Sequence, residues 1–136
     1  MFCESAPVPV RLDASTGGVL LLVRFSYNDR DPFAVQAAFF DGPCLLARWR
    51  FDRQMLAEGL HRPVGEGDVA FRPHARAGIG ELRIDLRGQG GEREEEAVLF
   101  VDADPLAVFL EQTYTVIGAG EEFLDLDRLL DEFLAR

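Results

Sequence analysis

Apolar stretches of strand length, separated by turn residues, fill the first half of the chain, and in residues 44–51 hydrophobic and polar positions alternate as in a β-strand with one buried and one solvated face. Asp41-Gly42 predicts a tight reversal between two of these strands, and the Asx residues and proline of segment 28–32 predict a connector. Residues 1–9 lack a clear alternation and are expected to form a loose arm. The strands predicted in this half cover residues 10–13, 19–27, 33–40 and 44–51.

The two faces of strand 44–51 differ in polarity. Arg48 and Arg50 lie on the face expected to be wet, and the face expected to be buried carries Leu45, Ala47, Trp49 and Phe51. Because successive strands are joined by short connections, the first half of the chain is predicted to form an antiparallel meander.

A short helix is expected after the meander. Asp52 is a suitable N-cap residue, and Gly59 can end the helix in a left-handed conformation, so the helix is predicted over Arg53–Glu58. A loop over residues 61–67 follows, and then a second run of strands. These strands cover residues 68–72, 78–86 and 92–101, with a hairpin loop over 88–91.

Two helices are predicted to close the chain. Asp104 and Pro105 form a strong N-cap and N1 pair, and the face of the first helix that follows carries Leu106, Phe109, Leu110 and Thr113. The second helix begins at about Asp125, and its apolar stripe comprises Leu126, Leu129, Leu130, Phe133 and Leu134. The stripe is expected to pack on the sheet; the other interpretation is a surface reserved for a partner. The complete pattern predicts an α+β fold, with a curved antiparallel sheet, a short middle helix and C-terminal helices.

Length and composition predict one folded domain over residues 1–136. The formal net charge is −10, and all 14 basic residues are arginine, so the chain should repel nucleic acid and anionic lipid at long range. No apolar run approaches the about 18 residues of a membrane span, and the N-terminus lacks the basic region and apolar stretch of a signal peptide. We therefore expect a cytoplasmic protein without membrane insertion.

The residue types that carry catalysis or bind metals are few and scattered. Cys3 and Cys44 are expected to be unpaired thiols, with a disulfide between them as the alternative. A metal site of His61, Asp68 and His74 is conceivable, but neither histidine has another ligand at metal-binding spacing. No nucleophile has a base in a recognisable pattern, so no enzymatic activity, cofactor or metal is expected.

Three stretches resemble elements of one protein family. The longest is Leu56-Ala57-Glu58-Gly59-Leu60-His61-Arg62-Pro63-Val64-Gly65-Glu66-Gly67-Asp68-Val69, which is similar to the LAEGLHRPxGxGDV signature of the SsgA-like proteins of actinomycetes. Asp31-Pro32-Phe33-Ala34-Val35 resembles the DPYAV or DPFAV element of that family, and Phe123-Leu124-Asp125-Leu126-Asp127 resembles its FDLD element. The resemblance extends over roughly residues 18–135.

The resemblance implies both a fold and a function. Members of the family have a β-rich domain similar to the whirly single-strand nucleic-acid binders, and they assemble as homo-oligomers. They act in developmental cell division, in the best-known case by bringing the tubulin-like FtsZ to future septum sites. For this chain the resemblance implies a non-enzymatic protein-interaction factor at the septum of sporulating cells. FtsZ or another SsgA-like protein is the implied partner, and a trimer is the first expectation for its assembly.

Most of the motif residues have a structural interpretation. The glycines and Pro63 suit a helix end and a bend, Leu56 and Leu60 suit the anchoring of a helix, and Asp68 suits a hydrogen bond to nearby backbone. His61 and Arg62 have no evident folding role, so they are the candidates for a partner or subunit contact. The other matched positions are Asp31, Pro32, Leu56, Glu58, Gly59, Leu60, Pro63, Gly65, Gly67 and Asp68.

A single-stranded nucleic-acid binder of whirly-like fold is the alternative function. Arg48 and Arg50 share one strand face with aromatic residues nearby, which is an arrangement that single-strand binders use. The net charge and the lack of lysine count against this alternative, so nucleic acid is not expected as a partner. A wall-modifying hydrolase is the third hypothesis, and it lacks any catalytic set that the sequence can supply.

Overall fold

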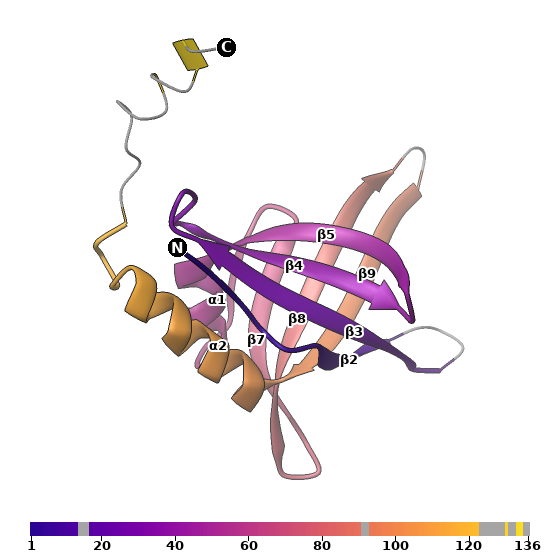
Figure 1. Cartoon of the computed structure of the whole chain (residues 1–136). Helices are drawn as coiled ribbons and strands as arrows, with labels where there is room; N and C mark the ends of the chain where they lie inside the picture. Colours follow the sequence, from indigo (N-terminus) through magenta and orange to yellow (C-terminus); the bar gives the residue numbers. More distant parts are fainter. Residues whose placement is uncertain (14–16, 91–92, 123–129, 131–132, 135–136) are drawn as a thin grey trace.

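The computed structural model describes residues 1–13, 17–90, 93–122, 130 and 133–134. In this part of the chain, nine strands form one curled antiparallel sheet, and two helices pack against it (Figure 1). The strands are β1 (Phe2–Glu4), β2 (Val8–Asp13), β3 (Val19–Asn28), β4 (Ala34–Asp41), β5 (Cys44–Asp52), β6 (Val64–Glu66), β7 (Val69–Arg76), β8 (Ile79–Gly90) and β9 (Arg93–Asp102). The helices are α1 (Arg53–Gly59) and α2 (Ala103–Val116).

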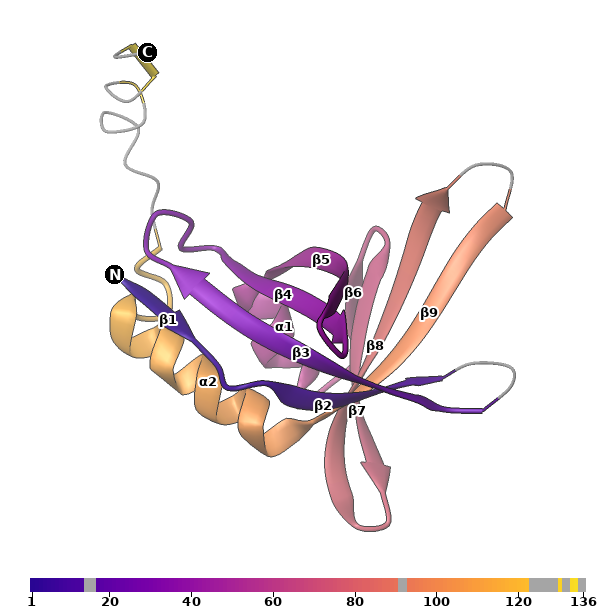
Figure 2. The same cartoon turned by 45° about the vertical axis from the view of Figure 1, so that its right-hand side comes forward.

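The strand order is β5-β4-β3-β2-β9-β8-β7-β6, and β1 pairs separately with β3. β2 pairs with β3 on one side and with β9 on the other, so it joins the N-terminal meander to the second run of strands. Figure 2 shows β1 running between α2 and β3, and the β8–β9 hairpin extending away from the helices. The predicted meander and the predicted α+β class, with a curved antiparallel sheet, are confirmed.

The face of the sheet that is directed toward the helices is apolar. At alternate positions β3 buries Leu21, Val23, Phe25 and Tyr27. The predicted apolar face of α2 is confirmed, because Leu106, Phe109, Leu110 and Thr113 are all buried. The ring of Phe25 stacks on that of Phe109 with 5.9 Å between the centroids, which ties α2 directly to β3.

Residues 1–9, expected to form a loose arm, instead join the sheet. Phe2–Glu4 pair with Ser26–Asn28 of β3, and Val8 opens β2 opposite Val23. Between the two strands, the Ser5 hydroxyl accepts a hydrogen bond from the backbone N–H of Phe25 at 2.9 Å. The prediction was wrong because a strand as short as β1 cannot display an alternating pattern.

A β-bulge in β5 changes the face on which Leu45 lies. Ala47 pairs with Phe39 but Leu45 pairs with Phe40, so Leu46 has no residue opposite it. The inserted residue reverses the alternation, and Leu45 is 44% exposed on the outer face instead of buried as predicted. Before the bulge the prediction holds: the residues directed inward include Ala47, Trp49 and Phe51.

The second run of strands is longer than its local sequence indicates. β6 lies within the predicted loop over 61–67, and β7 continues to Arg76 beyond the predicted end at Arg72. β8 includes Gly88–Gly90, which were expected in the hairpin loop, because its pairing with β9 continues to Gly90 opposite Arg93. Backbone pairing with a neighbouring strand therefore overrides the local turn signal of the glycines.

α2 starts two residues earlier than predicted. Its N-cap is Asp102, whose side chain forms no capping hydrogen bond, and Asp104 lies inside the first turn. An acidic side chain there is favourable because the N-terminus of a helix carries partial positive charge. The predicted last helix lies mainly outside the described residues, as does the FDLD-like element over 123–127. The described members of its stripe are exposed and do not pack on the sheet of the same chain: Leu130, Phe133 and Leu134.

α1 begins as predicted, because the Asp52 carboxylate accepts a hydrogen bond from the backbone N–H of Met55 at 2.8 Å. Its end differs from the prediction. Gly59 lies inside the helix without a left-handed conformation, and Leu60 is the C-cap residue. Glycine is required for another reason, since a Cβ at position 59 would lie 2.4 Å from the Cβ of Phe71 on β7.

Gly59→Ala should lower the free energy of unfolding by about 1–3 kcal/mol, because α1 must move away from β7 to relieve the overlap. Urea denaturation followed by circular dichroism measures the change. Gly80→Ala is the matched control, because the nearest atom to its Cβ would be 3.8 Å away and its φ is not positive. Equal losses for the two variants would contradict this role of Gly59.

Candidate functional site

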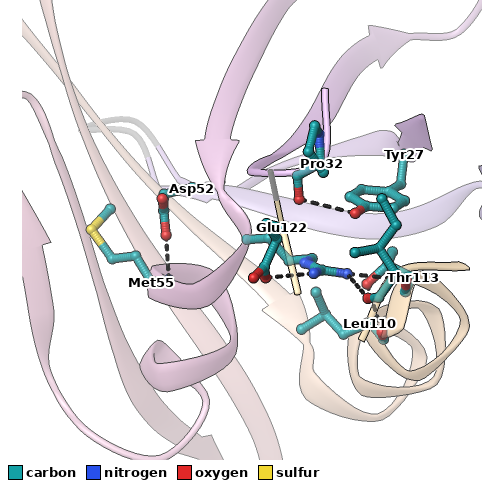
Figure 3. Close-up of polar contacts among 9 residues, drawn as sticks. Tyr27, Pro32, Asp52, Met55, Leu110, Thr113 and Glu122 are labelled. Carbon is teal, nitrogen blue, oxygen red and sulfur yellow. Dashed lines mark hydrogen bonds and ion pairs between the residues drawn. The ribbon is translucent and has the colours of Figure 1, made fainter. Parts of the chain in front are cut away.

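The Asp31-Pro32-Phe33 segment belongs to the DPFAV-like motif and forms part of the β3–β4 connection. Hydrogen bonds join it to β3, β5 and α1. Asp31 accepts two hydrogen bonds from the guanidinium of Arg50 on β5, at 2.8 and 2.7 Å. This hydrogen bonding raises the pKa of Arg50. The Pro32 carbonyl accepts a hydrogen bond from the Tyr27 hydroxyl at 2.9 Å (Figure 3), and the Phe33 carbonyl accepts one from the first backbone N–H of α1 at 2.8 Å. The motif therefore serves the fold, and Arg50 is already bound to a carboxylate.

Arg53, the first residue of α1, has a fully buried side chain. Its guanidinium donates hydrogen bonds to the backbone carbonyls of Thr113 at 3.0 Å and Ile117 at 2.8 Å, and it pairs with the Glu122 carboxylate at 2.5 Å (Figure 3). These carbonyls form the C-terminal end of α2, where the helix dipole favours a cation. One side chain thus joins α1, the end of α2 and the segment that follows α2.

Two tyrosine rings cover the guanidinium of Arg53. Its Cζ lies 4.9 Å from the ring centroid of Tyr27 and 4.1 Å from that of Tyr114. Burial raises the pKa of both phenols, and the nearby Arg53 charge opposes that rise. Burial also raises the pKa of the Cys3 thiol, against the opposing effect of Arg53. Cys3 and Cys44 are both free thiols, as expected, and Cys3 is not activated as a nucleophile.

Arg53 was not among the residues that the sequence predicted to be important. A signal was available, because Arg53, Leu56 and Leu60 are spaced i, i+3 and i+7 and therefore share one face of the helix. Leu56 is fully buried and Leu60 packs against the core, as predicted. An arginine on a core-facing position needs buried acceptors, and these come from a segment 60 or more residues away.

The glycines of the longer motif shape the connection from α1 to β7. Gly65 lies in β6 opposite Ala70, and a Cβ at position 65 would lie 3.2 Å from the Cβ of Ala70. Gly67 has a φ of 60°, so it supplies the left-handed residue of the β6–β7 turn. The backbone carbonyl of Asp68 accepts a hydrogen bond from the backbone N–H of Arg87 at 2.9 Å. That contact replaces the predicted one from the Asp68 side chain, and the exposed Pro63 leads from α1 into β6.

His61 and Arg62 lie exposed in the turn after α1. Their backbone N–H groups donate hydrogen bonds to the Glu58 carbonyl at 2.9 and 3.0 Å, which completes the end of the helix. The Arg62 guanidinium pairs with the Glu58 carboxylate at 3.0 Å, and its side chain is 68% exposed. An exposed pair of this kind contributes about 0.5 kcal/mol or less. The fold therefore depends on the backbone of this turn and not on the His61 and Arg62 side chains, which remain available to a partner.

The metal site that could be conceived from His61, Asp68 and His74 is not assembled. His74 lies on β7 beside Phe100, with 4.7 Å between the ring centroids, and its Nε2 is 3.9 Å from the Glu81 carboxylate. No three His, Cys, Asp or Glu side chains within the described ranges are grouped so that they could hold a metal ion. Neither of the helices in those ranges is long and apolar enough to cross a membrane.

The fold and the motif define a class of protein: a curled antiparallel sheet with two helices, and an exposed signature turn between α1 and β6. The chain belongs to the SsgA family. The sequence profile of that family, described as "Streptomyces sporulation and cell division protein, SsgA", matches residues 21–122. The resemblance inferred from the motifs is confirmed.

Two relatives of this chain are sporulation-specific cell division proteins. "Sporulation-specific cell division protein SsgB" of Streptomyces coelicolor is 40% identical over 111 residues, which cover 80% of this chain and 78% of that protein. SsgB of Thermobifida fusca is 32% identical over 134 residues, which cover 97% and 86% of the two chains.

Two solved structures are similar to this chain over most of their length. One is the crystal structure of an SsgA-like sporulation-specific cell division protein from Thermobifida fusca, with a TM-score of 0.82 and 32% identity over 98% of this chain and 94% of that one. The other comes from work on SsgB mutations that correlate with longitudinal cell division during sporulation of Streptomyces coelicolor. Its TM-score is 0.79 at 32% identity, over 90% of this chain and 94% of that one.

Arg53→Met should lower the free energy of unfolding by about 2–4 kcal/mol, because it leaves the Glu122 carboxylate and two helix-end carbonyls without their donor. Urea denaturation measures the loss. Arg62→Ala removes an exposed guanidinium close in sequence and should change the free energy of unfolding by at most about 0.5 kcal/mol. A loss for Arg53→Met as small as that for Arg62→Ala would contradict the role given to the buried charge.

The ion pair with Arg53 also predicts a pH dependence. The hydrogen bond from Arg53 lowers the pKa of Glu122 below the usual value of 4.5, so its contribution to stability is complete above that value. The contribution should be lost as the pH falls from 4.5 through the lower pKa of the folded protein. The difference in unfolding free energy between the natural chain and Glu122→Gln should therefore shrink toward acid. Glu121→Gln, a neighbouring change that does not touch Arg53, is the matched control.

Proposed function

We propose that this chain is a non-enzymatic protein-interaction factor in sporulation-specific cell division, which helps to position or activate the division septum. Its family membership and the names of its relatives support this role. The observation that carries the proposal is the signature turn, where His61 and Arg62 are exposed and their side chains have no essential contact in the fold. The site of action that follows is the cytoplasmic side of the septum.

FtsZ, or another SsgA-like protein, is the proposed partner at this turn. An imidazole and a guanidinium offer hydrogen-bond donors in a fixed place, since both backbone N–H groups are held by Glu58. A carboxylate-bearing protein segment suits the guanidinium of Arg62, which can exchange its exposed pair with Glu58 at little cost. Recruitment of the partner would then depend on surface complementarity and not on turnover.

The proposal includes a homo-oligomer, with a trimer as the first expectation. The face of the sheet opposite the helices exposes several large apolar side chains, more than isolated surface residues account for. The members on β3 and β5 include Leu20, Leu22 and Leu45.

The arginines of the outer face are the observation that favours the nucleic-acid alternative. Arg11 and Arg50 are already paired, with Glu81 at 3.0 Å and with Asp31 at 2.7 Å. Arg48 forms no ion pair with any residue in the described ranges. In a chain with a net charge of −10, so few unpaired arginines attract the phosphates of a nucleic acid only weakly. We therefore use single-stranded DNA as the counter-test and not as a proposed ligand.

Co-sedimentation with assembled FtsZ from the same source tests the proposal. The natural chain should sediment saturably with the polymer, and the His61→Ala/Arg62→Ala double variant should lose most of this binding, by about tenfold or more. The matched control is His74→Ala/Arg76→Ala, which removes the same two residue types from exposed positions on β7. Circular dichroism of each variant verifies that the fold is intact.

Either result of this experiment is informative. Loss of binding in the His61/Arg62 variant alone supports the proposed surface. Equal binding by both double variants would show that the signature turn is not the contact. If the natural chain does not sediment with FtsZ but binds single-stranded DNA with steep salt dependence, the nucleic-acid alternative replaces the proposal.

A further inference from the structure

The outer face of the sheet carries an apolar row that crosses four strands. Pro9 of β2 lies opposite Leu22 of β3, and Leu22 lies opposite Phe40 of β4. Phe40 in turn lies opposite Leu45 of β5, which the bulge at Leu46 has placed on this face. Cross-strand partners on one face have their Cβ atoms about 5 Å apart, so the row is continuous. Leu22 and Phe40 also line a shallow hollow at the surface.

Two arginines border this outer row. The next set of cross-strand partners along β3, β4 and β5 is Arg24, Ala38 and Arg48. Arg24 reaches Glu4 only at 3.6 Å between exposed side chains, and Arg48 has no ionic partner among the described residues. In a chain with a net charge of −10, this local excess of positive charge suits a segment that is apolar on one side and acidic on the other.

The C-terminal segment of the same chain has this composition. Its apolar residues follow the i, i+3, i+4, i+7, i+8 spacing of one helix face, and the other positions of 125–132 carry four carboxylates and one arginine, Arg128. The described apolar members are strongly exposed in the single chain, at 56%, 74% and 78% for Leu130, Phe133 and Leu134. The carboxylates are Asp125, Asp127, Asp131 and Glu132.

We propose that the C-terminal segment 125–134 of one copy docks on the outer row of a second copy. The apolar stripe of the segment covers Leu22, Phe40 and Leu45, and its carboxylates face Arg24 and Arg48. The inference rests on the proposed homo-oligomer and specifies the contact that builds it. Two apolar surfaces that are each exposed in the single chain are thereby buried together.

The place where the segment begins favours docking between copies. Glu122 is held by the buried Arg53 on the helix side of the sheet, whereas the outer row lies on the opposite side. A segment that reached the outer row of its own chain would have to pass around the edge of the sheet. A segment supplied by a neighbouring copy is free of this constraint.

Crosslinking between two distinguishable full-length chains tests the proposal, with Cys44 as the reporter because it is exposed and adjacent to Leu45. The first chain keeps Cys44 as its only thiol through Cys3→Ser. The second is tagged and carries its only thiol near the end of the segment, through Cys3→Ser, Cys44→Ser and Ala135→Cys. After mixing at micromolar concentration and treatment with a short bis-maleimide, a covalent heterodimer should form. A tagged chain with Val108→Cys in place of Ala135→Cys is the control, because Val108 is exposed on α2, away from the outer row.

Substitutions on either side of the contact should reduce the yield of heterodimer. Leu22→Arg in the first chain, or Phe133→Asp in the tagged chain, should each lower it by about tenfold or more, because burial of a large apolar side chain is worth at least that factor. Val108→Arg should leave it unchanged. A yield that is unaffected by Leu22→Arg overturns the proposal.

Light scattering on the same samples separates this contact from the oligomer itself. A mass that falls to that of the monomer in both the Leu22→Arg and the Phe133→Asp chains supports the docking. An oligomer that forms while the unsubstituted reporter pair gives no heterodimer crosslink overturns the docking and leaves the homo-oligomer standing. A crosslink confined to one copy, in a chain that carries both Cys44 and Ala135→Cys, also overturns docking between copies.

Discussion

A single buried cation holds the helices of this protein in position. A guanidinium removed from water is costly by several kcal/mol unless acceptors surround it, and Arg53 finds them only at the end of α2 and at Glu122. These acceptors come together only when α1, α2 and the chain to Glu122 are all in place. The Tyr27 ring beside the guanidinium extends the dependence to β3 and, through its hydroxyl, to the carbonyl of Pro32. The charge therefore couples α1, α2 and β3 in addition to the apolar core that they share.

Most residues of the motifs that identify the family make contacts that stabilise the fold, and only a few have side chains without such a contact. Asp31 and Pro32 fix the β3–β4 connection, and Gly59 allows α1 to approach β7. Asp31 acts through its carboxylate and Gly59 through its lack of a side chain, so these two positions are restricted for a physical reason, whereas Pro32 contributes its backbone carbonyl. His61 and Arg62 are different, because only their backbone completes the helix end. A motif can thus be specific to a family while most of its residues never meet a partner.

The two faces of the curled sheet have different roles. The inner face is sealed by α2, where Phe25 stacks on Phe109, and it supplies the stability on which the rest depends. The outer face exposes an apolar row that the alternation alone would have placed differently, because the bulge at Leu46 moves Leu45 onto it. This division suits the interaction role proposed above, because the core determines the shape while the outer face and the signature turn stay exposed.

The sequence by itself determined the α+β class, the meander, the Asp52 cap, the buried face of α2 and the family, because periodicity, capping chemistry and a long motif are local properties. Only the tertiary structure decided the remainder. Pairing with β3 drew Phe2–Glu4 into the sheet, an inserted residue reversed Leu45, and the neighbouring Phe71 explained Gly59. The structural role of Arg53 was likewise visible only in the tertiary structure. Its hydrogen-bond acceptors lie far along the chain, and no local pattern can report a contact that exists only after the chain has folded.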